Sequence, residues 1–451
     1  MFIIMKKTLL ALTVALMLVL IMVPVSVSAA EGTAVTNAAE FKAMKSGESY
    51  YLANDIDFGG ERFQCYILQE FSGKLDGNGF CIYNFSIDGT DIESDCGIIQ
   101  RANKTGNLEI VNLTIGKSDA PVSLFTNASG KSHGILFGAQ ENSNSATITN
   151  VTIYANLRVQ SNGKANAGGY IGYSRVVTFE SCNIYGVIEV GSGMNEVDPV
   201  YHNAAGYIGS ANNDMTNFIK CENNAEIISY CSEVEARAAG FVSYTAGGTN
   251  FTDCANYGKV TVYDCGLQMA DGTAAGFVGH ANKTTPVILE NCTNYGEVTA
   301  SNWCSAMVAH VVSGAFFSNC VNEGTYNTQA LVCGPFVGNV TESAIVEYES
   351  TCVDKMDTSV VWGPAETTTE APTMTTEAPA DTTTEAPEET EAPAEDTTTA
   401  APEATDTTVA PTTQAPTTEA PKAEGGCGSV MMPVAIVAIL GCAWVAFSKK
   451  R

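Results

Sequence analysis

The chain has 451 residues, which is long enough for more than one domain. Its 49 acidic and 22 basic residues give a formal net charge of -27 at pH 7, which argues against nucleic-acid binding because that function needs clustered lysine and arginine. The 41 glycines and the small share of charged residues, 16%, favour short strands and turns over helices.

The N-terminal segment, 1–30, predicts a secretory signal peptide. Lys6 and Lys7 supply the positively charged start, residues 9–23 the apolar core, and the small residues at 28–30 a cleavage site. An uncleaved anchor helix is the alternative, but the run of small residues favours cleavage. The remaining chain is therefore expected to be exported.

Residues 31–95 are expected to form an N-terminal cap and the first coils of a solenoid. Asn37 and Glu40 have the spacing of a capping box and predict a short helix over residues 38–45, ended by Gly47. Such a helix would cover the first strand edge, which otherwise invites pairing with another chain.

Residues 96–363 contain a repeated unit, seen most clearly at 276–298, GFVGHANKTTPVILENCTNYGEV. The unit begins with glycine, an aromatic residue, an apolar residue and a small residue, and it ends with the pattern Cys-x-Asn-x-Gly. Its anchor cysteines recur at intervals of roughly 30 to 40 residues, which indicates a solenoid. These cysteines are Cys182, Cys221, Cys254, Cys292, Cys320 and Cys352.

Each repeat contains two or three short apolar segments separated by turns, as at 108–115, 134–137 and 146–153. Strands of this length that return at a fixed interval predict a parallel β-helix with about eight or nine coils stacked ~4.8 Å apart. Crossovers between parallel strands are nearly always right-handed. The predicted fold class is therefore all-β, a right-handed parallel β-helix solenoid, followed by a disordered stalk and one transmembrane helix.

Stacked coils place equivalent side chains above one another, which assigns roles to the repeated residues. The anchor cysteines are expected to form an inward column of small apolar side chains; a disulfide or metal column is the alternative, but the chain has no CxxC pair. A second set of cysteines keeps no single register, and one or two local disulfides are the open alternative there: Cys231, Cys265, Cys304 and Cys333.

Two further repeated residue types are expected to stack. The asparagines two residues after the anchor cysteines, Asn223, Asn256, Asn294 and Asn322, are expected to hydrogen-bond along the stack. Tyr257 and Tyr295 are expected to stack on each other, and if they face outward they become ligand-binding candidates for a sugar.

Residues 364–426 change to near-repeats of Thr, Thr, Glu, Ala and Pro. Such a segment buries no core, and its prolines and acidic residues make it extended, so it is expected to be a disordered stalk; a plain linker is the alternative.

Residues 427–451 hold a juxtamembrane motif, a predicted transmembrane helix at 430–447 and a basic end, Lys449 to Arg451. This arrangement predicts a single-pass chain with its N-terminus outside. Cys427 is a candidate for C-terminal processing or modification, and an unmodified thiol is the alternative.

No catalytic motif is recognisable. The four histidines form no HExxH motif, and there is no GxSxG or phosphate-binding loop, so the sequence predicts a protein that is not an enzyme and has no catalytic, metal or cofactor site. Several aspartates in the repeats share no register and are expected to be scattered surface acids: Asp198, Asp214, Asp253, Asp264 and Asp271. Recognition is instead expected in the loops that interrupt the repeat, near 191–203, 229–238 and 263–273.

The segments YYLANDIDF and FSGKLDGNGFCIYNFSI, together with the recurring G-[FY]-[VI]-[GS] and C-x-N-x-G motifs, resemble bacterial cell-surface β-helix proteins with GLUG-type repeats. The resemblance covers about residues 40–350. It implies a membrane-anchored protein on the extracellular face of the membrane or in the cell wall, acting in adhesion or in binding a glycan or a protein on a host or neighbouring cell. A metallopeptidase with HExxH accompanies some members, and that motif is absent here. A surface-attached polysaccharide lyase or glycoside hydrolase and a passive spacer remain the alternatives, and no pattern specifies an oligomeric state.

Overall fold

The computed structural model describes residues 31–356, except for 103–105, 142–144, 162, 192–200, 213–214, 231–233, 264–270, 283–284 and 342. The predicted signal peptide, stalk, Cys427 and membrane segment therefore lie outside the described residues. In the part of the chain that is described, no helix combines the length and the apolar character needed to span a membrane.

The described residues form three sheets that run the length of one stack. The nine-stranded sheet contains β4 (Tyr66–Phe71), β7 (Gly97–Ala102), β11 (Phe137–Gln140), β14 (Ile171–Ser174), β18 (Ile208–Ala211), β22 (Val242–Thr245), β27 (Val278–Ala281), β32 (Val308–Val311) and β37 (Val337–Val340). The seven-stranded sheet contains β10 (Lys131–Gly134), β13 (Ala165–Gly168), β17 (His202–Ala205), β21 (Glu235–Ala239), β26 (Asp271–Ala275), β31 (Trp303–Ser305) and β36 (Val332–Gly334).

The third sheet, called here the bent sheet, has 23 strands because most coils contribute to it twice. Its strands are β1 (Thr33–Val35), β2 (Glu48–Leu52), β3 (Ile56–Gln64), β5 (Gly73–Asp76), β6 (Cys81–Gly89), β8 (Leu108–Ile115), β9 (Val122–Thr126), β12 (Ala146–Val159), β15 (Val177–Glu180), β16 (Asn183–Val190), β19 (Thr216–Ile219), β20 (Glu222–Tyr230), β23 (Thr249–Thr252), β24 (Ala255–Asn256), β25 (Val260–Tyr263), β28 (Val287–Glu290), β29 (Thr293–Asn294), β30 (Glu297–Thr299), β33 (Gly314–Ser318), β34 (Val321–Asn322), β35 (Thr325–Tyr326), β38 (Ile345–Tyr348) and β39 (Val353–Asp354).

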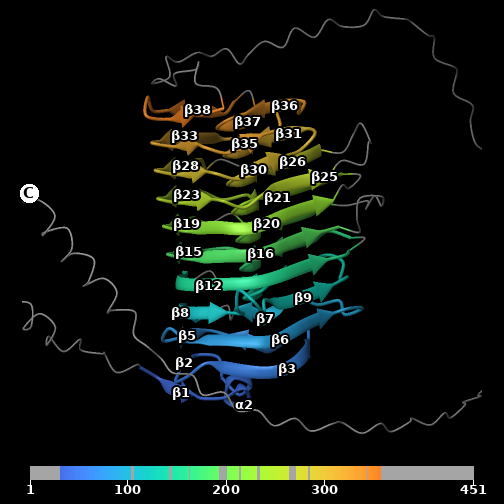
Figure 1. Cartoon of the computed structure of the whole chain (residues 1–451), viewed down its shortest axis with the longest axis vertical. Helices are drawn as coiled ribbons and strands as arrows, with labels where there is room; N and C mark the ends of the chain where they lie inside the picture. The colour runs from blue at the N-terminus through green and yellow to red at the C-terminus, as the bar shows by residue number, and fades with distance from the viewer. Residues whose placement is uncertain are drawn as a thin grey trace, which may run out of the picture. The chain divides into compact units, whose positions relative to one another are not determined.

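Successive coils pair in parallel, strand upon equivalent strand, as β17, β18, β19 and β20 pair with β21, β22, β23 and the β24–β25 pair. Figure 1 shows the coils stacked from β1 and α2 at one end to β36 and β38 at the other. The predicted all-β, parallel β-helix solenoid is thus confirmed, and the nine-stranded sheet gives nine coils in the described part.

Two details of the predicted coil were wrong. The coils contribute three to five strands, with three in β5 to β7, four in β17 to β20 and five in β23 to β27, so the expected two or three holds for only some of them. The apolar segment at 134–137, predicted as a strand, spans the bend between β10 and β11. Short apolar runs do not distinguish a strand from a tight bend whose side chains are all buried, which is why periodicity failed here.

A single residue with left-handed backbone turns the chain between the two halves of the bent sheet. Asn112, Asn150, Asn291 and Asn319 occupy this bend with φ between 51° and 54°. Asparagine tolerates this region better than most residues because its short amide bonds locally. The bend asparagines also bond to each other: Asn150 Nδ2 donates to Asn112 Oδ1 at 2.9 Å, and Asn319 Nδ2 donates to Asn291 Oδ1 at 3.1 Å.

Two interleaved columns of aromatic rings fill the centre of the stack. The rings of Tyr170, Tyr207, Phe241 and Phe277 stack with centroids 4.7 to 4.9 Å apart. The neighbouring column of Phe179, Phe218 and Phe251 meets them edge to face at 5.3 to 5.5 Å. Glycine precedes each ring of the first column because the backbone passes too close for a side chain: a Cβ at Gly240 would lie 2.1 Å from Gly276 O. The repeated glycine–aromatic motif is therefore a packing device.

The predicted cap helix is present but shorter than expected. Helix α2 spans Ala38–Lys42 instead of 38–45, and Asn37 Oδ1 accepts a hydrogen bond from Glu40 N at 3.0 Å. Phe41 and Met44 are buried beneath the first coils. The helix covers the N-terminal end of the core, as the sequence predicted.

The predicted inward columns of cysteine and asparagine are confirmed. The anchor cysteines, from Cys182 to Cys352, are buried free thiols in one register, and burial raises the pKa of the Cys292 thiol. Asn223 Nδ2 donates to Asn256 Oδ1 at 2.7 Å, Asn256 Nδ2 to Asn294 Oδ1 at 2.8 Å, and Asn294 Nδ2 to Asn322 Oδ1 at 3.0 Å.

The second set of cysteines departs in part from its predicted lack of register. Cys304 and Cys333 are partners in the pairing of β31 with β36, so these two do share a register. Cys231 and Cys265 lie outside the described residues.

Candidate functional site

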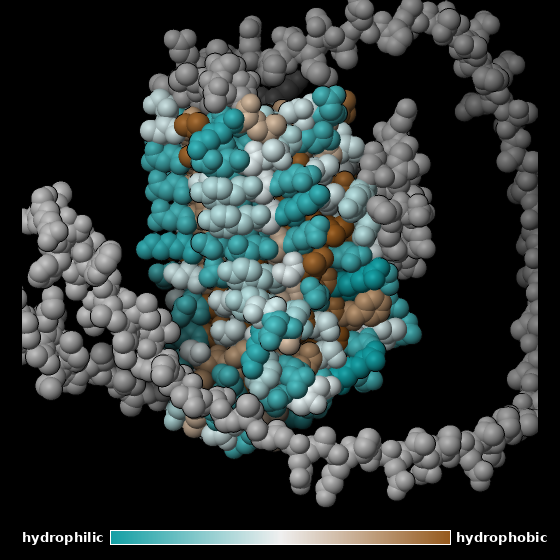
Figure 2. Space-filling view, in the orientation of Figure 1, coloured by the Kyte–Doolittle hydropathy of each residue, from teal (hydrophilic) through white to brown (hydrophobic). Residues whose placement is uncertain are grey.

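Tyr257 and Tyr295 stack on each other and also face outward. Their rings are parallel within 2° with centroids 4.7 Å apart, and each residue is 46% exposed. They lie on the bent sheet, whose visible surface in Figure 2 is covered by rows of mainly hydrophilic and near-neutral side chains. The predicted stacking is confirmed. Parallel rings at this spacing cover each other's faces, however, so the pair offers a ligand mostly hydroxyl groups and ring edges.

Two columns of side chains lie side by side where the seven-stranded and nine-stranded sheets meet, and together they are called here the corner groove. On the nine-stranded sheet, strand pairing aligns Tyr173, Ser210, Tyr244, His280 and His310. On the seven-stranded sheet, it aligns Asn166, Asn203, Arg237, Thr273 and Trp303. The two columns run side by side, so side chains that leave one sheet contact those that leave the other.

A buried ion pair forms the floor of the corner groove. Arg237 and Glu235 are 5% and 6% exposed, and the Arg237 guanidinium donates to both carboxylate oxygens of Glu235. Arg237 Nη1 also donates to Asn203 Oδ1 at 3.1 Å, and His280 Nδ1 lies 3.2 Å from Glu235 Oε1. Removing two charges from water is costly, and apolar side chains would fill the same space at least as well. The net contribution of the pair to stability is therefore expected to be small, whereas loss of one partner alone would leave an unpaired buried charge.

Aromatic rings form the rim. The Arg237 guanidinium lies 4.8 Å from the ring centroid of Tyr244 and 5.3 Å from that of Tyr201, which is 41% exposed. The His310 ring lies 4.3 Å from the centroids of both His280 and Trp303. These rings are tilted by 47° to 76° to each other, unlike the parallel tyrosines of the bent sheet. Tyr244 and Trp303 are partly exposed, and exposed aromatic surface can contact the apolar CH groups of a ligand.

The protonation states follow from the surroundings. Burial favours the neutral form of Glu235, but His280 and Arg237 outweigh it and hold the pKa of this carboxyl below its usual value. Burial and the neighbouring His280 lower the pKa of His310 to about 4. At neutral pH the corner groove therefore contains the Glu235–Arg237 ion pair and an uncharged His310.

A hollow of about 280 Å³ is lined by Glu141, Tyr173, Arg175 and Asn212, of which Tyr173 belongs to the column of the nine-stranded sheet. Asn212 Nδ2 donates to the Tyr173 hydroxyl at 2.6 Å, and Asn282 Nδ2 donates to the Tyr244 hydroxyl at 2.9 Å. Both tyrosine rings are thereby fixed in orientation.

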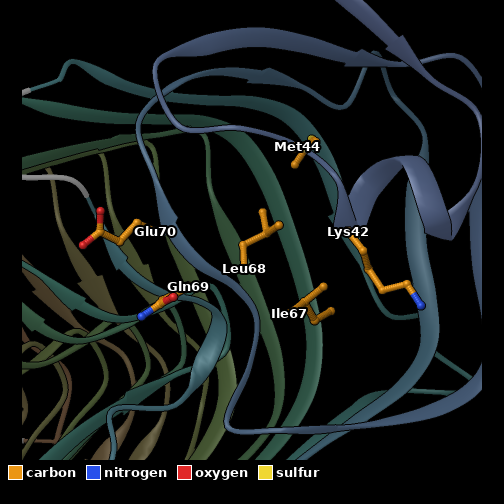
Figure 3. Close-up of a pocket in the computed structure, with 6 residues that line it drawn as sticks. All are labelled: Lys42, Met44, Ile67, Leu68, Gln69 and Glu70. Atoms are coloured by element: carbon orange, nitrogen blue, oxygen red, sulfur yellow. The ribbon is translucent and has the colours of Figure 1, made fainter.

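A larger hollow of about 490 Å³ lies between helix α2 and β4. Figure 3 shows its polar groups apart from each other, with Lys42 on one side and Glu70 on the other. Lys42 Nζ is paired with Glu61 at 2.9 Å. The hollow is a gap between the cap and the first coil without convergent polar groups.

The predicted scatter of the aspartates fits where the structure describes them. Asp253 lies at the left-handed bend and its carboxylate accepts from Asn291 Nδ2 at 3.1 Å. Asp271 begins β26, and Asp198, Asp214 and Asp264 lie outside the described residues. Within the described ranges, no three His, Cys, Asp or Glu side chains are placed to hold a metal ion.

A buried histidine makes the stability of the fold depend on pH. His133 is fully buried, and burial lowers its pKa to about 4 despite the nearby Asp95; Lys131 acts in the same direction as burial. Because the unfolded chain binds a proton near pH 6.5 and the folded chain does not, stability is complete above that pH and falls as the pH drops toward 4, by roughly 3 kcal/mol. His133→Leu should flatten this part of a curve of unfolding free energy against pH. An unchanged slope between pH 6.5 and 4 would contradict the assignment.

Comparisons with known proteins give one structural likeness. No family model and no curated protein matches the chain. A crystal structure described as a "putative immunoglobulin A1 protease" from Bacteroides ovatus aligns with 70% of this chain and 86% of its own, at 17% sequence identity and a TM-score of 0.40.

Proposed function

We propose that this protein binds carbohydrate in the corner groove while displayed on the outside of a bacterial cell. The observation that carries the proposal is a buried ion pair, Glu235 and Arg237, beside the partly exposed aromatic rings of Tyr244 and Trp303. Sugar rings present an apolar CH face and a rim of hydroxyl groups, so they match aromatic faces set beside charged and amide side chains.

Display at the surface is supported by the sequence pattern of the two ends. The expected signal peptide at 1–30, the stalk at 364–426 and the membrane helix within 427–451 imply that residues 31–363, wound in the right-handed sense, lie outside the cell. The stacked Tyr257 and Tyr295, whose rings cover each other, lie outside the proposed binding site.

The test is a glycan array probed with the full chain in detergent micelles. Binding to neutral oligosaccharides is expected, with little dependence on salt because the ion pair is internally neutralised. Binding restricted to sulfated glycans and abolished by salt would contradict the proposal. Absence of binding would favour a passive spacer.

Polysaccharide cleavage is a second candidate, favoured by the contact of His280 Nδ1 with Glu235 at 3.2 Å. A carboxylate at one imidazole nitrogen fixes the tautomer and leaves the other nitrogen as a base. Any glycan that binds should be incubated with the protein and examined for new chain ends. Cleavage that is lost in His280→Gln while binding persists would replace adhesion by catalysis as the principal function.

A further inference from the structure

The C-terminal end of the described stack is open, in contrast to the N-terminal end beneath α2. Strands β36, β37 and β38 stand at the edges of their sheets at this end (Figure 1). Leu331 and Ile345 there are 67% and 60% exposed, the highest values among the large apolar residues described. Unpaired strand edges beside exposed apolar side chains favour pairing with another strand.

The chain itself contains a matching strand directly after the described part. Residues 331–335 read Leu-Val-Cys-Gly-Pro, and residues 360–364 read Val-Val-Trp-Gly-Pro. The structure pairs Cys304 with Cys333, and the step along the chain from Cys333 to Trp362 is equal in length to the step from Cys304 to Cys333. The last strand of the seven-stranded sheet is thus repeated in sequence at the spacing of the preceding coil.

We propose that residues 360–363 dock on β36 as the next strand of the seven-stranded sheet, with Val361, Trp362 and Gly363 opposite Val332, Cys333 and Gly334. The inward column at this position consists of small residues, Ala238, Ala274, Cys304 and Cys333. The first three are fully buried, whereas Cys333 is only partly buried. Trp362 at the end of the column covers Cys333 and closes the core.

Chain length permits this arrangement. The connection from Asp354 in β39 to Trp362 is only slightly shorter than the one from Asn294 in β29 to the equivalent Cys304. An extended chain reaches ~3.3 Å per residue, so the eight steps from Asp354 to Trp362 can span at most about 26 Å. Such a short tether favours the chain's own segment over a second molecule, because the effective concentration is high. Pro364 lacks an amide proton and ends the strand, so the stalk begins there.

The reactivity of the Cys333 thiol tests the proposal in the full chain. A brief pulse of iodoacetamide, followed by peptide mass mapping, measures alkylation of Cys333 and Cys304 separately. In the wild type, Cys333 is expected to react at least about tenfold more slowly than in urea, and Trp362→Ala or Val361→Asp should remove most of this protection through local opening. Val409→Asp, a matched change in the stalk, should leave it intact. Continued protection of Cys304 shows that each variant remains folded.

Two results would overturn the proposal. Equal, fast alkylation of Cys333 in the wild type and in Trp362→Ala would mean that the end stays open. Protection that persists in both variants but is lost on dilution would mean that a second copy of the chain, rather than residues 360–363, covers the end.

Discussion

Replacing Arg237 by methionine is expected to destabilise the β-helix by about 3–5 kcal/mol, because it leaves the buried carboxylate of Glu235 without its principal partner. The double variant Glu235→Gln with Arg237→Met removes both charges and should recover much of this loss. Denaturant unfolding monitored by circular dichroism measures both effects. The denaturant concentration at the unfolding midpoint is expected to be highest for the wild type, intermediate for the double variant and lowest for Arg237→Met.

The dependence on pH provides a check on the same pair. Since the pKa of Glu235 is lowered in the folded state, its contribution is present above the usual carboxyl pKa and is lost as the pH falls below that value. Arg237→Met should therefore weaken the loss of stability below about pH 4.5. An Arg237→Met variant as stable as the wild type at pH 7 would contradict the assignment of Arg237 as the principal partner of a buried Glu235 carboxylate.

Replacing Asn256 by alanine is expected to destabilise the fold by roughly 2–4 kcal/mol. Its amide accepts from Asn223, donates to Asn294 and also lies within hydrogen-bond distance of Gly258 O, 3.0 Å away. All three asparagines are fully buried, so the groups left without a partner cannot bond to water. The urea concentration at the unfolding midpoint should be lower for Asn256→Ala than for the wild type.

Asn250→Ala is the matched control for this ladder. Asn250 also donates to the equivalent residue one coil away, Asn217, at 3.1 Å, but from the partly exposed outer face of the bent sheet. Its replacement should cost less than about 1 kcal/mol. Equal losses in the two variants would mean that the inner ladder has no special role in holding the coils in register.

The architecture could be predicted from the sequence because stacking imposes one local rule on every coil. Equivalent side chains must coincide, so the cysteine and asparagine columns follow directly from the spacing of Cys221, Cys254 and Cys292. The count of strands in a coil could not be predicted this way, because the bends at Gly206 and Gly240 are as apolar and as buried as the strands around them.

The corner groove was missed because its residues differ in type from coil to coil. The sequence nevertheless contains the signal. The residue directly after each G-[FY]-[VI]-[GS] motif forms one column, as Tyr244 and His280 do, and the residue three before the motif's glycine forms the other, as Arg237 does. A motif search looks for the same residue types in every repeat. A binding surface on a repeat protein occupies the same positions in every repeat, but the residue types at those positions differ.

The loops near 191–203, 229–238 and 263–273 were predicted to carry recognition. The described parts of these loops contribute Tyr201 and Arg237 to the corner groove, so the predicted loops and the observed cluster lie in the same part of the fold. Most of these loops lies outside the described residues, and their contribution to binding stays a prediction.

The most direct test of carbohydrate binding in the corner groove compares two variants in titrations with one oligosaccharide identified by the array. Trp303→Ala removes a partly exposed ring from the corner groove, and Tyr257→Ala removes an exposed stacked ring from the bent sheet. The account predicts that Trp303→Ala weakens binding at least about tenfold, ~1.4 kcal/mol, while Tyr257→Ala changes the dissociation constant less than about twofold. The reverse order, with the loss confined to Tyr257→Ala, would contradict it.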